Sequence, residues 1–464
     1  MAKVKTVFTC QECGYQSAKW MGKCPDCNQW NSFTESEFTK PSNVVSKAAP
    51  KSIGNRTSKP KTIAEIEEEK FDRYQTGLGE FDRVMGGGVT LGSLTLIGGE
   101  PGIGKSTLLM EVCGRLVDNY QDEKIIYVSG EESESQVANR SKRMGVNNPH
   151  FYIYNETNWE KILEQVKDLK PKFLVIDSIQ TTHSSQVESA AGTLSQIREV
   201  TYELMNYAKA YGLTCFIIGH VTKEGQIAGP KILEHMVDTV IYFEGDQLGQ
   251  YRMLRVMKNR FGNTNEVGIF EMQEKGLVEI KNPSQYFLEQ SLPGAFGRSL
   301  TCILEGSRSL FVEIQALVVE NKFAVGRRTT QGLDSNRVAL LVAVIDKYFG
   351  VPLSYNDIYV NVVGGMKLSS RENDLSVIAS LLSSYFATAL DGDTIFLGEV
   401  GLTGEVRSVP MMELRLKEIA QMNYKRVITS KRASEDFKGK YKLELIGISK
   451  AVELKQLLFK KDKA

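Results

Sequence analysis

Long apolar runs are missing from this sequence. No stretch of the 464 residues reaches the roughly 18 consecutive apolar residues of a membrane-spanning helix. Residues 1–6 also lack the apolar core of a signal peptide. We therefore expect a cytoplasmic protein without a membrane segment.

A surplus of charge of either sign is missing as well. The chain has 57 Lys and Arg residues against 56 Asp and Glu residues, so its overall charge does not indicate a nucleic-acid-binding protein. Any basic surface must be local. At 464 residues the chain is too long for one core, and roughly three domains are expected.

Cysteine is scarce, with seven residues in the chain. Cys10 and Cys13, then Cys24 and Cys27, form two Cys-x-x-Cys pairs with ten residues between them. Four thiolates satisfy tetrahedral Zn²⁺, and a segment of about 30 residues cannot fold by apolar burial alone. A redox pair would need only one Cys-x-x-Cys, and the cytosol disfavours disulfides. We predict a structural zinc site on all four thiolates. Buried free thiols are predicted for the cysteines in apolar surroundings, Cys113, Cys215 and Cys302.

A glycine-rich turn joins a strand-like run, residues 93–97, to a helix-like run, residues 107–112. Its spacing, Gly-x-x-x-x-Gly-Lys-Ser, lets backbone N–H groups surround a β-phosphate at a helix N-terminus. Lys105 then carries the charge for the β- and γ-phosphates of ATP, and the Ser106 hydroxyl binds Mg²⁺. A glycine turn that binds nothing is the alternative. The predicted nucleotide-binding residues are Gly99, Glu100, Pro101, Gly102, Ile103, Gly104, Lys105, Ser106 and Thr107.

The next buried-type strand, residues 124–132, ends in two carboxylates, Glu131 and Glu132. A carboxylate at such a strand end can activate the water that attacks the γ-phosphate. We assign this role to Glu131 first and to Glu132 second. An acidic helix start, which the helix dipole favours, is the alternative.

Two further strands end in polar residues. Residues 173–178 place Asp177 after four apolar residues, which predicts a Mg²⁺ ligand, and residues 215–220 end in His220. His220 suits a γ-phosphate sensor, with an ordinary surface histidine as the alternative. The carboxyl edge of a parallel sheet brings such strand ends together.

Three polar segments are candidates for contact with nucleic acid. Residues 40–62 hold six Lys or Arg and no acid, which predicts a flexible tether that is either merely solvated or touches nucleic acid. Residues 182–192 and 223–231 have the composition of mobile loops. If subunits form a ring, Lys223 and Lys231 can contact a nucleic-acid backbone; ordinary surface loops are the alternative.

A cationic hairpin follows late in the predicted core. Residues 255–266 are typical of a strand entering a hairpin, and residues 267–270 of its return. Strand alternation puts Lys258 and Arg260 on one face. The pair could stabilise phosphoryl charge in a neighbouring subunit, as arginine fingers do. The alternative is a solvated hairpin.

The order of these motifs resembles the RadA (Sms) family of bacterial DNA-repair ATPases over essentially the full chain. RecA-type cores in general share only the phosphate loop and the acidic strands. The resemblance implies a RecA-like motor that forms homo-hexameric rings on single-stranded DNA and has DnaB-helicase-like activity. It further implies extension of branched recombination intermediates by branch migration alongside RecA. The specific marker is the run Lys258, Asn259, Arg260, Phe261 and Gly262.

The last part of the chain resembles the proteolytic domain of Lon-type proteases. In that family a Ser nucleophile and a Lys base act together; the resemblance places them at Leu375 and Arg415, and neither residue can serve. Ser376 and Lys417 stand nearby, so a shifted dyad stays open. We expect an α+β scaffold for ring assembly, with DNA binding left open. The predicted strands and helices are residues 299–305, 310–319, 334–349, 357–363, 372–389 and 400–406.

The predicted fold is α/β, with a RecA-like P-loop ATPase core on a mainly parallel sheet. The predicted function is an ATP-dependent DNA motor in recombinational repair. A regulatory or assembly ATPase of the KaiC kind is the alternative, and an active protease is a third. The predicted domains are a four-cysteine zinc finger at 1–33, a basic linker at 34–62, the ATPase at 63–283 and an inactive Lon-protease-like domain at 284–464.

Overall fold

The computed structural model divides the chain into two compact units. One comprises Met1–Gly245 with Tyr251–Glu279, and the other Asp246–Gln250 with Ile280–Ala464. The residues it describes are 5–10, 16–17, 19–23, 25, 30–31, 33–38, 62, 72–220, 231–245, 251–282, 294–321, 326–368 and 370–459.

A small antiparallel sheet begins the chain. Strand β1 (Lys5–Cys10) pairs with β2 (Gln16–Ser17) on one side and with β3 (Phe33–Phe38) on the other. The expected boundary at residue 33 therefore falls inside this sheet, because β3 continues to Phe38, opposite Lys5. Hydrogen bonding along the whole of β1 holds these extra residues in the module.

The first unit is built on a nine-stranded sheet in the order β14-β13-β12-β11-β6-β10-β9-β7-β8. The strands from β11 to β8 run parallel, and β12, β13 and β14 are added antiparallel. The predicted mainly parallel sheet is confirmed. Its strands are β6 (Leu94–Gly99), β7 (Ile125–Ser129), β8 (Phe151–Tyr154), β9 (Phe173–Asp177), β10 (Thr214–His220), β11 (Thr239–Gly245), β12 (Tyr251–Asn259), β13 (Val267–Gln273) and β14 (Gly276–Glu279).

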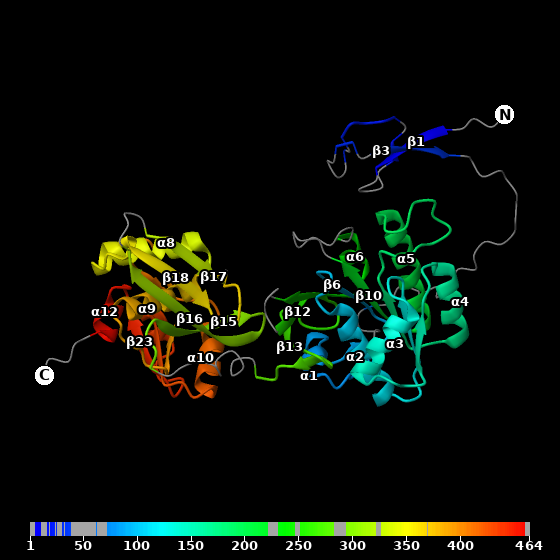
Figure 1. Ribbon diagram of the computed structural model, residues 1–464. Helices are drawn as coiled ribbons and strands as arrows, with labels where there is room; N and C mark the ends of the chain where they lie inside the picture. The colour runs from blue at the N-terminus through cyan, green and yellow to red at the C-terminus, as the bar shows by residue number, and fades with distance from the viewer. Residues whose placement is uncertain are drawn as a thin grey trace, which may run out of the picture. The chain divides into compact units, whose positions relative to one another are not determined.

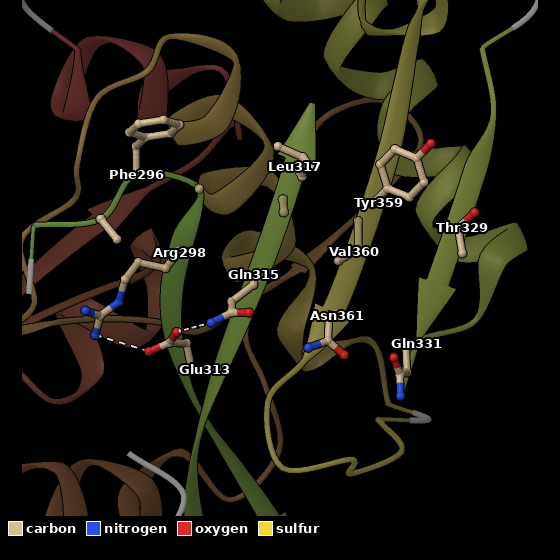
Figure 2. A pocket seen from close by; sticks show the side chains of 13 residues that line it. Phe296, Arg298, Glu313, Gln315, Leu317, Thr329, Gln331, Tyr359, Val360 and Asn361 are labelled. Atoms are coloured by element: carbon tan, nitrogen blue, oxygen red, sulfur yellow. Dashed lines mark hydrogen bonds and ion pairs between the residues drawn. The ribbon is translucent and has the colours of Figure 1, made fainter. Parts of the chain in front are cut away.

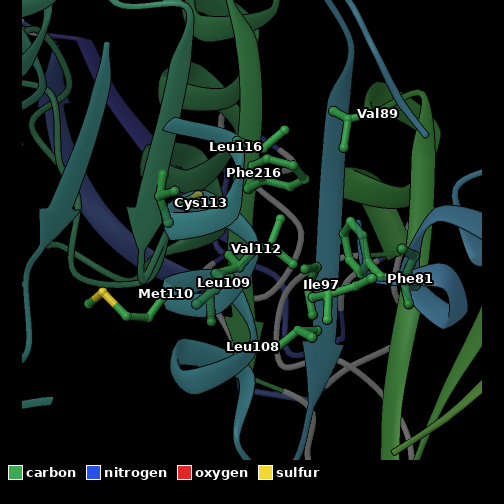
Figure 3. Close-up of a cluster of buried hydrophobic side chains, with 14 of the residues drawn as sticks. Phe81, Val89, Ile97, Leu108, Leu109, Met110, Val112, Cys113, Leu116 and Phe216 are labelled. Atoms are coloured by element: carbon green, nitrogen blue, oxygen red, sulfur yellow. The ribbon is translucent and has the colours of Figure 1, made fainter. Parts of the chain in front are cut away.

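Helices cover both faces of this sheet (Figure 1). Alternate residues of each central strand enter opposite cores, as strand geometry requires: Ile97 joins the cluster in Figure 3, whereas Leu96 joins the other. Helices α1, α2 and α3 contribute to the first cluster and α4, α5 and α6 to the second. These helices are α1 (Gly79–Val84), α2 (Lys105–Asn119), α3 (Glu134–Met144), α4 (Trp159–Leu169), α5 (Leu194–Tyr211) and α6 (Lys231–Met236), with β4 (Arg73–Tyr74) and β5 (Val89–Thr90) paired beside them.

The second unit is a mixed sheet of seven strands in the order β17-β18-β16-β15-β19-β22-β23. The expected separate α+β architecture matches this arrangement. Its strands are β15 (Arg298–Glu305), β16 (Arg308–Glu320), β17 (Arg328–Gln331), β18 (Asn356–Val362), β19 (Thr394–Phe396), β22 (Arg426–Ser430) and β23 (Glu444–Ile448), with β20 (Glu399–Val400) and β21 (Val406–Arg407) paired apart. Its helices are α8 (Ser335–Val344), α9 (Asp374–Tyr385), α10 (Met412–Gln421), α11 (Lys431–Asp436) and α12 (Glu453–Leu458), with a π-helical segment η2 (Ile345–Phe349) and two short 3-10 helices, η3 (Leu353–Tyr355) and η4 (Arg371–Asn373).

Candidate functional site

The glycine-rich turn connects β6 directly to α2. Gly104 has φ +116°, a conformation that favours glycine, and a Cβ at Gly99 would lie 2.6 Å from the Phe243 carbonyl oxygen. Lys105, the first residue of α2, is buried, and its ammonium donates to the carbonyls of Gly99 and Glu100, each at 2.8 Å. The turn thus has the strand–loop–helix context that the phosphate-loop motif requires.

Asp177, the last residue of β9, lies next to this turn. Its carboxylate accepts a hydrogen bond from the Tyr127 hydroxyl at 2.5 Å and another from the Ser106 side chain. Burial raises the pKa of Asp177, and these two hydrogen bonds oppose the rise. The two residues predicted to bind Mg²⁺, Ser106 and Asp177, are therefore brought together.

Glu131 follows β7 and faces the same edge. Its carboxylate accepts from the Ser178 hydroxyl at 2.6 Å and lies 3.0 Å from Nε2 of His220. Burial alone would raise the pKa of Glu131, but the hydrogen bonds from Ser178 and His220 and the charge of Lys105 outweigh it, and the pKa is lowered. A carboxylate in this state is ionised at neutral pH.

Glu132 is held differently from Glu131. Its carboxylate forms an ion pair with Arg140 of α3, and its backbone carbonyl accepts from the Ser129 hydroxyl at 3.0 Å. The capping box of Ser133 and Gln136 starts α3 immediately afterwards. Glu132 is thus paired with a residue of the next helix, whereas Glu131 contacts His220 and is stabilised by the charge of Lys105.

The two candidate loops differ in what the structure describes. The loop at residues 182–192 is fastened: the Ser184 hydroxyl donates to Glu160 at 2.6 Å, and the Gln196 amide donates to the Ser189 carbonyl at 2.7 Å. Its composition suggested mobility, but these two buried anchors hold it. Residues 221–230, with Lys223, lie outside the described residues, and α6 begins directly after them at Lys231.

The predicted cationic hairpin forms, with β12 and β13 antiparallel and Arg255 opposite Val267. Lys258 and Arg260 both lie beside Asp238. They differ in their contacts, because the Lys258 ammonium donates to backbone carbonyls at the end of α6 and the Arg260 guanidinium is more than half exposed.

One of the four predicted zinc ligands lies within the described residues. Cys10 is buried at the end of β1, in a small cluster with Phe33. Lys23 and Trp30, which stand on either side of the second Cys-x-x-Cys pair in the sequence, form an antiparallel β-bridge. Cys13, Cys24 and Cys27 lie outside the described residues. The four-thiolate zinc site therefore stays a prediction.

The two positions aligned with a protease dyad are filled by core residues. Leu375 is buried in α9, and Arg415 of α10 is buried with its guanidinium 2.6 Å from Glu372. The nearby pair is not assembled either, since the buried Ser376 hydroxyl lies 2.7 Å from that of Ser299 and Lys417 is exposed.

A groove of about 470 Å³ lies elsewhere on this unit, over the open part of the sheet formed by β15, β16, β17 and β18 (Figure 2). Its floor carries a chain of polar contacts in which Glu313 lies 3.2 Å from Arg298 and accepts from Gln315 at 2.8 Å. Neither Leu375 nor Arg415 lines it. The groove is therefore separate from the two positions predicted to align with a protease dyad.

Three residues that contact the predicted site residues were not predicted from the sequence motifs. Tyr127 is in the middle of β7, Ser178 follows Asp177, and Arg140 is on α3. Only the register of β7 beside β9, with Ser129 opposite Asp177, brings Tyr127 to the carboxylate. A tyrosine inside a buried strand is the one sequence signal, since its hydroxyl needs a partner.

Comparisons with known proteins match two family models to this chain. The family model described as "AAA domain" matches residues 59–226, and the one described as "Rubredoxin metal binding domain" matches residues 8–35. The chain is 48% identical over 453 residues to DNA repair protein RadA of Bacillus subtilis (strain 168), covering 98% of each chain. It is 46% identical over 459 residues to DNA repair protein RadA of Streptococcus pyogenes serotype M1, covering 99% of this chain and 100% of the other.

Among solved structures, a KaiC-like protein from Pyrococcus horikoshii OT3 is 22% identical and has a TM-score of 0.39. The match covers 45% of this chain and 99% of that one. In the described parts of the chain, every helix is too short or too polar to cross a membrane.

Proposed function

The chain belongs to the RadA family of bacterial DNA repair proteins and carries an ATPase domain, and from this premise we propose that it is an ATP-driven DNA motor. The motor acts in the cytoplasm as a homo-hexameric ring on single-stranded DNA. It extends branched recombination intermediates by branch migration together with RecA. The observation that carries the proposal is the meeting of Lys105, Asp177 and Glu131 at one sheet edge.

Each residue at this edge has a role in the proposal. ATP with Mg²⁺ supplies the phosphoanhydride whose cleavage drives movement. Lys105 balances the charge of the β- and γ-phosphates, while Ser106 and Asp177 hold Mg²⁺. Glu131 takes the proton of the attacking water at its carboxylate, and His220, 3.0 Å away, senses the γ-phosphate. We prefer Glu131 to Glu132 because the latter is paired with Arg140.

The flanking domains have supporting roles. We propose that Cys10, Cys13, Cys24 and Cys27 hold a structural Zn²⁺, since Cys10 is buried at the end of a paired strand and the rubredoxin-type model spans all four. The Lon-protease-like unit is a scaffold without peptidase activity.

The decisive experiment is branch migration on a labelled three-strand joint. The full-length protein should convert the joint to product with ATP and Mg²⁺, and should stop when ATP is replaced by a non-hydrolysable analogue. Lys105→Ala is the matched inactive control. Product formed at the same rate without nucleotide would contradict a motor.

A second measurement separates a motor from a regulatory or assembly ATPase of the KaiC kind. ATP turnover is measured with and without single-stranded DNA of mixed sequence. A DNA motor should hydrolyse ATP several-fold faster on DNA. Turnover that is the same with and without DNA would favour the regulatory ATPase.

A further inference from the structure

The phosphate loop, residues 99–106, packs against strands on one side of β6. Phe243 of β11 and Met272 of β13 lie close to its last glycine: a Cβ at Gly104 would lie 2.6 Å from Cε of Met272 and 3.4 Å from Cε1 of Phe243. Strand β12 lies between β11 and β13 in the sheet and begins at Tyr251. The strands that extend the sheet beyond β6 therefore lie against the loop.

Arg252, the second residue of β12, binds the backbone of the loop directly. Its Nε donates to the Ile103 carbonyl oxygen at 3.2 Å, and its Nη1 donates to the Tyr251 carbonyl oxygen at 2.9 Å. A Cβ at Gly245 would lie 2.6 Å from Cδ of Arg252 and 2.9 Å from Cδ1 of Ile103. Because Gly245 has no side chain, the stem of Arg252 and the side chain of Ile103 can both lie over it.

The hydrogen bond to Ile103 sets the orientation of the peptide unit between Ile103 and Gly104. In a trans peptide the C=O and the following N–H point in opposite directions. Since Arg252 holds the Ile103 carbonyl toward β12, the Gly104 N–H points away from β12. Gly104 immediately precedes α2, where N–H groups have no intrahelical acceptor. Its N–H is one of the donors that this motif offers to a phosphate.

We propose that Arg252 is a positioning residue of the nucleotide site, which keeps the Gly104 N–H directed at the β-phosphate of a nucleotide. The inference rests on the proposed function, because Gly104 belongs to the proposed ATP site. Glycine has more accessible backbone conformations than other residues, so this peptide unit depends on a contact from outside the loop. A donor that is fixed before binding lowers the entropy cost of binding. Nucleotide affinity, more than the chemical step, should therefore depend on Arg252.

The test compares two neutral substitutions of Arg252 in the full chain. Arg252→Gln places an amide N–H donor the same number of bonds from the backbone as Nε, whereas Arg252→Met has the same length and no donor. Arg255→Met is the matched control, because Arg255 lies on the same strand and pairs with Glu244 at 3.2 Å. Three quantities are measured: affinity for ADP carrying a fluorescent N-methylanthraniloyl group, affinity for AMP by competition, and ATP turnover over a range of ATP concentrations.

Arg252→Met should weaken ADP binding by about three- to tenfold, the effect of one lost hydrogen bond. AMP has no β-phosphate, so its affinity should be the same in all variants, which also shows that the rest of the pocket is intact. The KM for ATP should rise with the Kd for ADP, while kcat at saturating ATP should stay within about twofold of wild type. Arg252→Gln should restore most of the ADP affinity, and Arg255→Met should bind ADP as the wild type does.

Three results would overturn the inference. ADP affinity of Arg252→Met equal to that of Arg255→Met would show that the contact to Ile103 does not position the loop. Equal weakening in Arg252→Gln and Arg252→Met would show that the guanidinium charge acts on the phosphates, because both substitutions remove the charge and only one removes the donor. If the wild type itself bound no ADP, the proposed nucleotide site would fail and the inference with it, a result distinct from tight binding by every variant.

Discussion

Burial and charge act in opposite directions on the ionisable residues around the phosphate loop. Burial lowers the pKa of Lys105, and the charges of Asp177 and Glu131 oppose that change. Burial raises the pKa of Asp177, whereas the hydrogen bonds and Lys105 lower the pKa of Glu131 despite burial. The two carboxylates therefore differ in proton affinity, although both must be ionised to act, one as a ligand of a cation and the other as a base.

Replacement of Lys105 is the first prediction at the residue scale. Lys105→Ala should lower ATP turnover by roughly 10²- to 10³-fold, because the main cation of the phosphate loop is lost. The fold should persist, since the lost contacts are two hydrogen bonds to loop carbonyls and not apolar packing. Steady-state turnover and the far-ultraviolet circular dichroism spectrum check the two parts. Near-normal turnover would remove the phosphate-loop assignment.

Asp177→Asn should separate stability from activity. Because the folded pKa of Asp177 is raised above its unfolded value, the carboxyl contributes stability below the unfolded pKa and loses it as pH rises through the folded pKa. At neutral pH the ionised carboxylate therefore costs stability, and asparagine removes this cost. The melting temperature of Asp177→Asn should equal or exceed that of wild type at neutral pH, with a smaller gain in acid. Mg²⁺-dependent turnover should fall by about a hundredfold or more.

The contradicting result for Asp177→Asn is a melting temperature clearly below wild type at neutral pH, with the gap closing in acid. That pattern would mean that the ionised carboxylate stabilises the chain through Tyr127 and Ser106 more than burial destabilises it. Asp122→Ser is a suitable control, because Asp122 is an exposed aspartate outside the site.

At the scale of elements, the sequence predicts the strands that carry the site and the edge at which they end. Each buried strand can be recognised alone, and the carboxyl-edge rule then places Glu131, Asp177 and His220 together. The hydrogen bond from Tyr127 and the capping of α6 by Lys258 could not be predicted. Both depend on strand register, of β7 beside β9 and of β11 beside β12, which composition does not encode.

The N-terminal sheet should depend on the proposed Zn²⁺ for its folding. Cys10→Ala should release Zn²⁺ and unfold β1 to β3, because metal binding in such modules is folding free energy, about 10–16 kcal/mol apparent in zinc-finger peptides. Metal analysis of the purified protein and exchange of the β1 amides measure the two effects. Ala substitution of Cys113, buried in the ATPase core, is the control and should keep the metal. A wild-type protein without zinc would contradict the assignment.

The buried ion pair of Arg415 and Glu372 gives a prediction about the stability of the second unit. Arg415→Met should destabilise the second unit by about 3–5 kcal/mol, because Glu372 is left buried without its cation. The double variant with Glu372→Gln should lose less than the sum of the single changes. Exchange of the α10 amides measures the stability. Casein should stay uncut by the wild type, and cleavage abolished by Ser376→Ala would contradict an inactive domain.

At the scale of the whole molecule, the distribution of cations favours hydrolysis at subunit interfaces. Each subunit already places Lys105 in its own phosphate loop, and Lys258 is occupied by the end of α6. Arg260 remains exposed on a hairpin late in the core. An exposed guanidinium with free donors is most useful against the nucleotide of a neighbour. Turnover in a ring should then require residues from two subunits.

Mixing two inactive variants tests this requirement. Glu131→Gln should bind ATP without activating water. Arg260→Ala should keep a complete pocket of its own but supply no guanidinium to the nucleotide of the neighbouring subunit. In mixed rings, the intact Arg260 of a Glu131→Gln subunit can contact the nucleotide bound in the complete pocket of a neighbouring Arg260→Ala subunit. If subunits exchange at random, about one interface in four is active at equal mixing. Turnover should therefore rise from near zero to a maximum at equal amounts and fall symmetrically on either side.

The shape of that curve distinguishes the possible roles of Arg260. A baseline that stays flat across all ratios, with mixed rings confirmed by native mass, would show that Arg260 acts within its own subunit or not at all. Lys105→Ala mixed with Glu131→Gln is the matched control, because both defects lie in the pocket itself. No arrangement of these two variants creates a complete pocket, so their mixture should stay inactive even where the Arg260 mixture recovers.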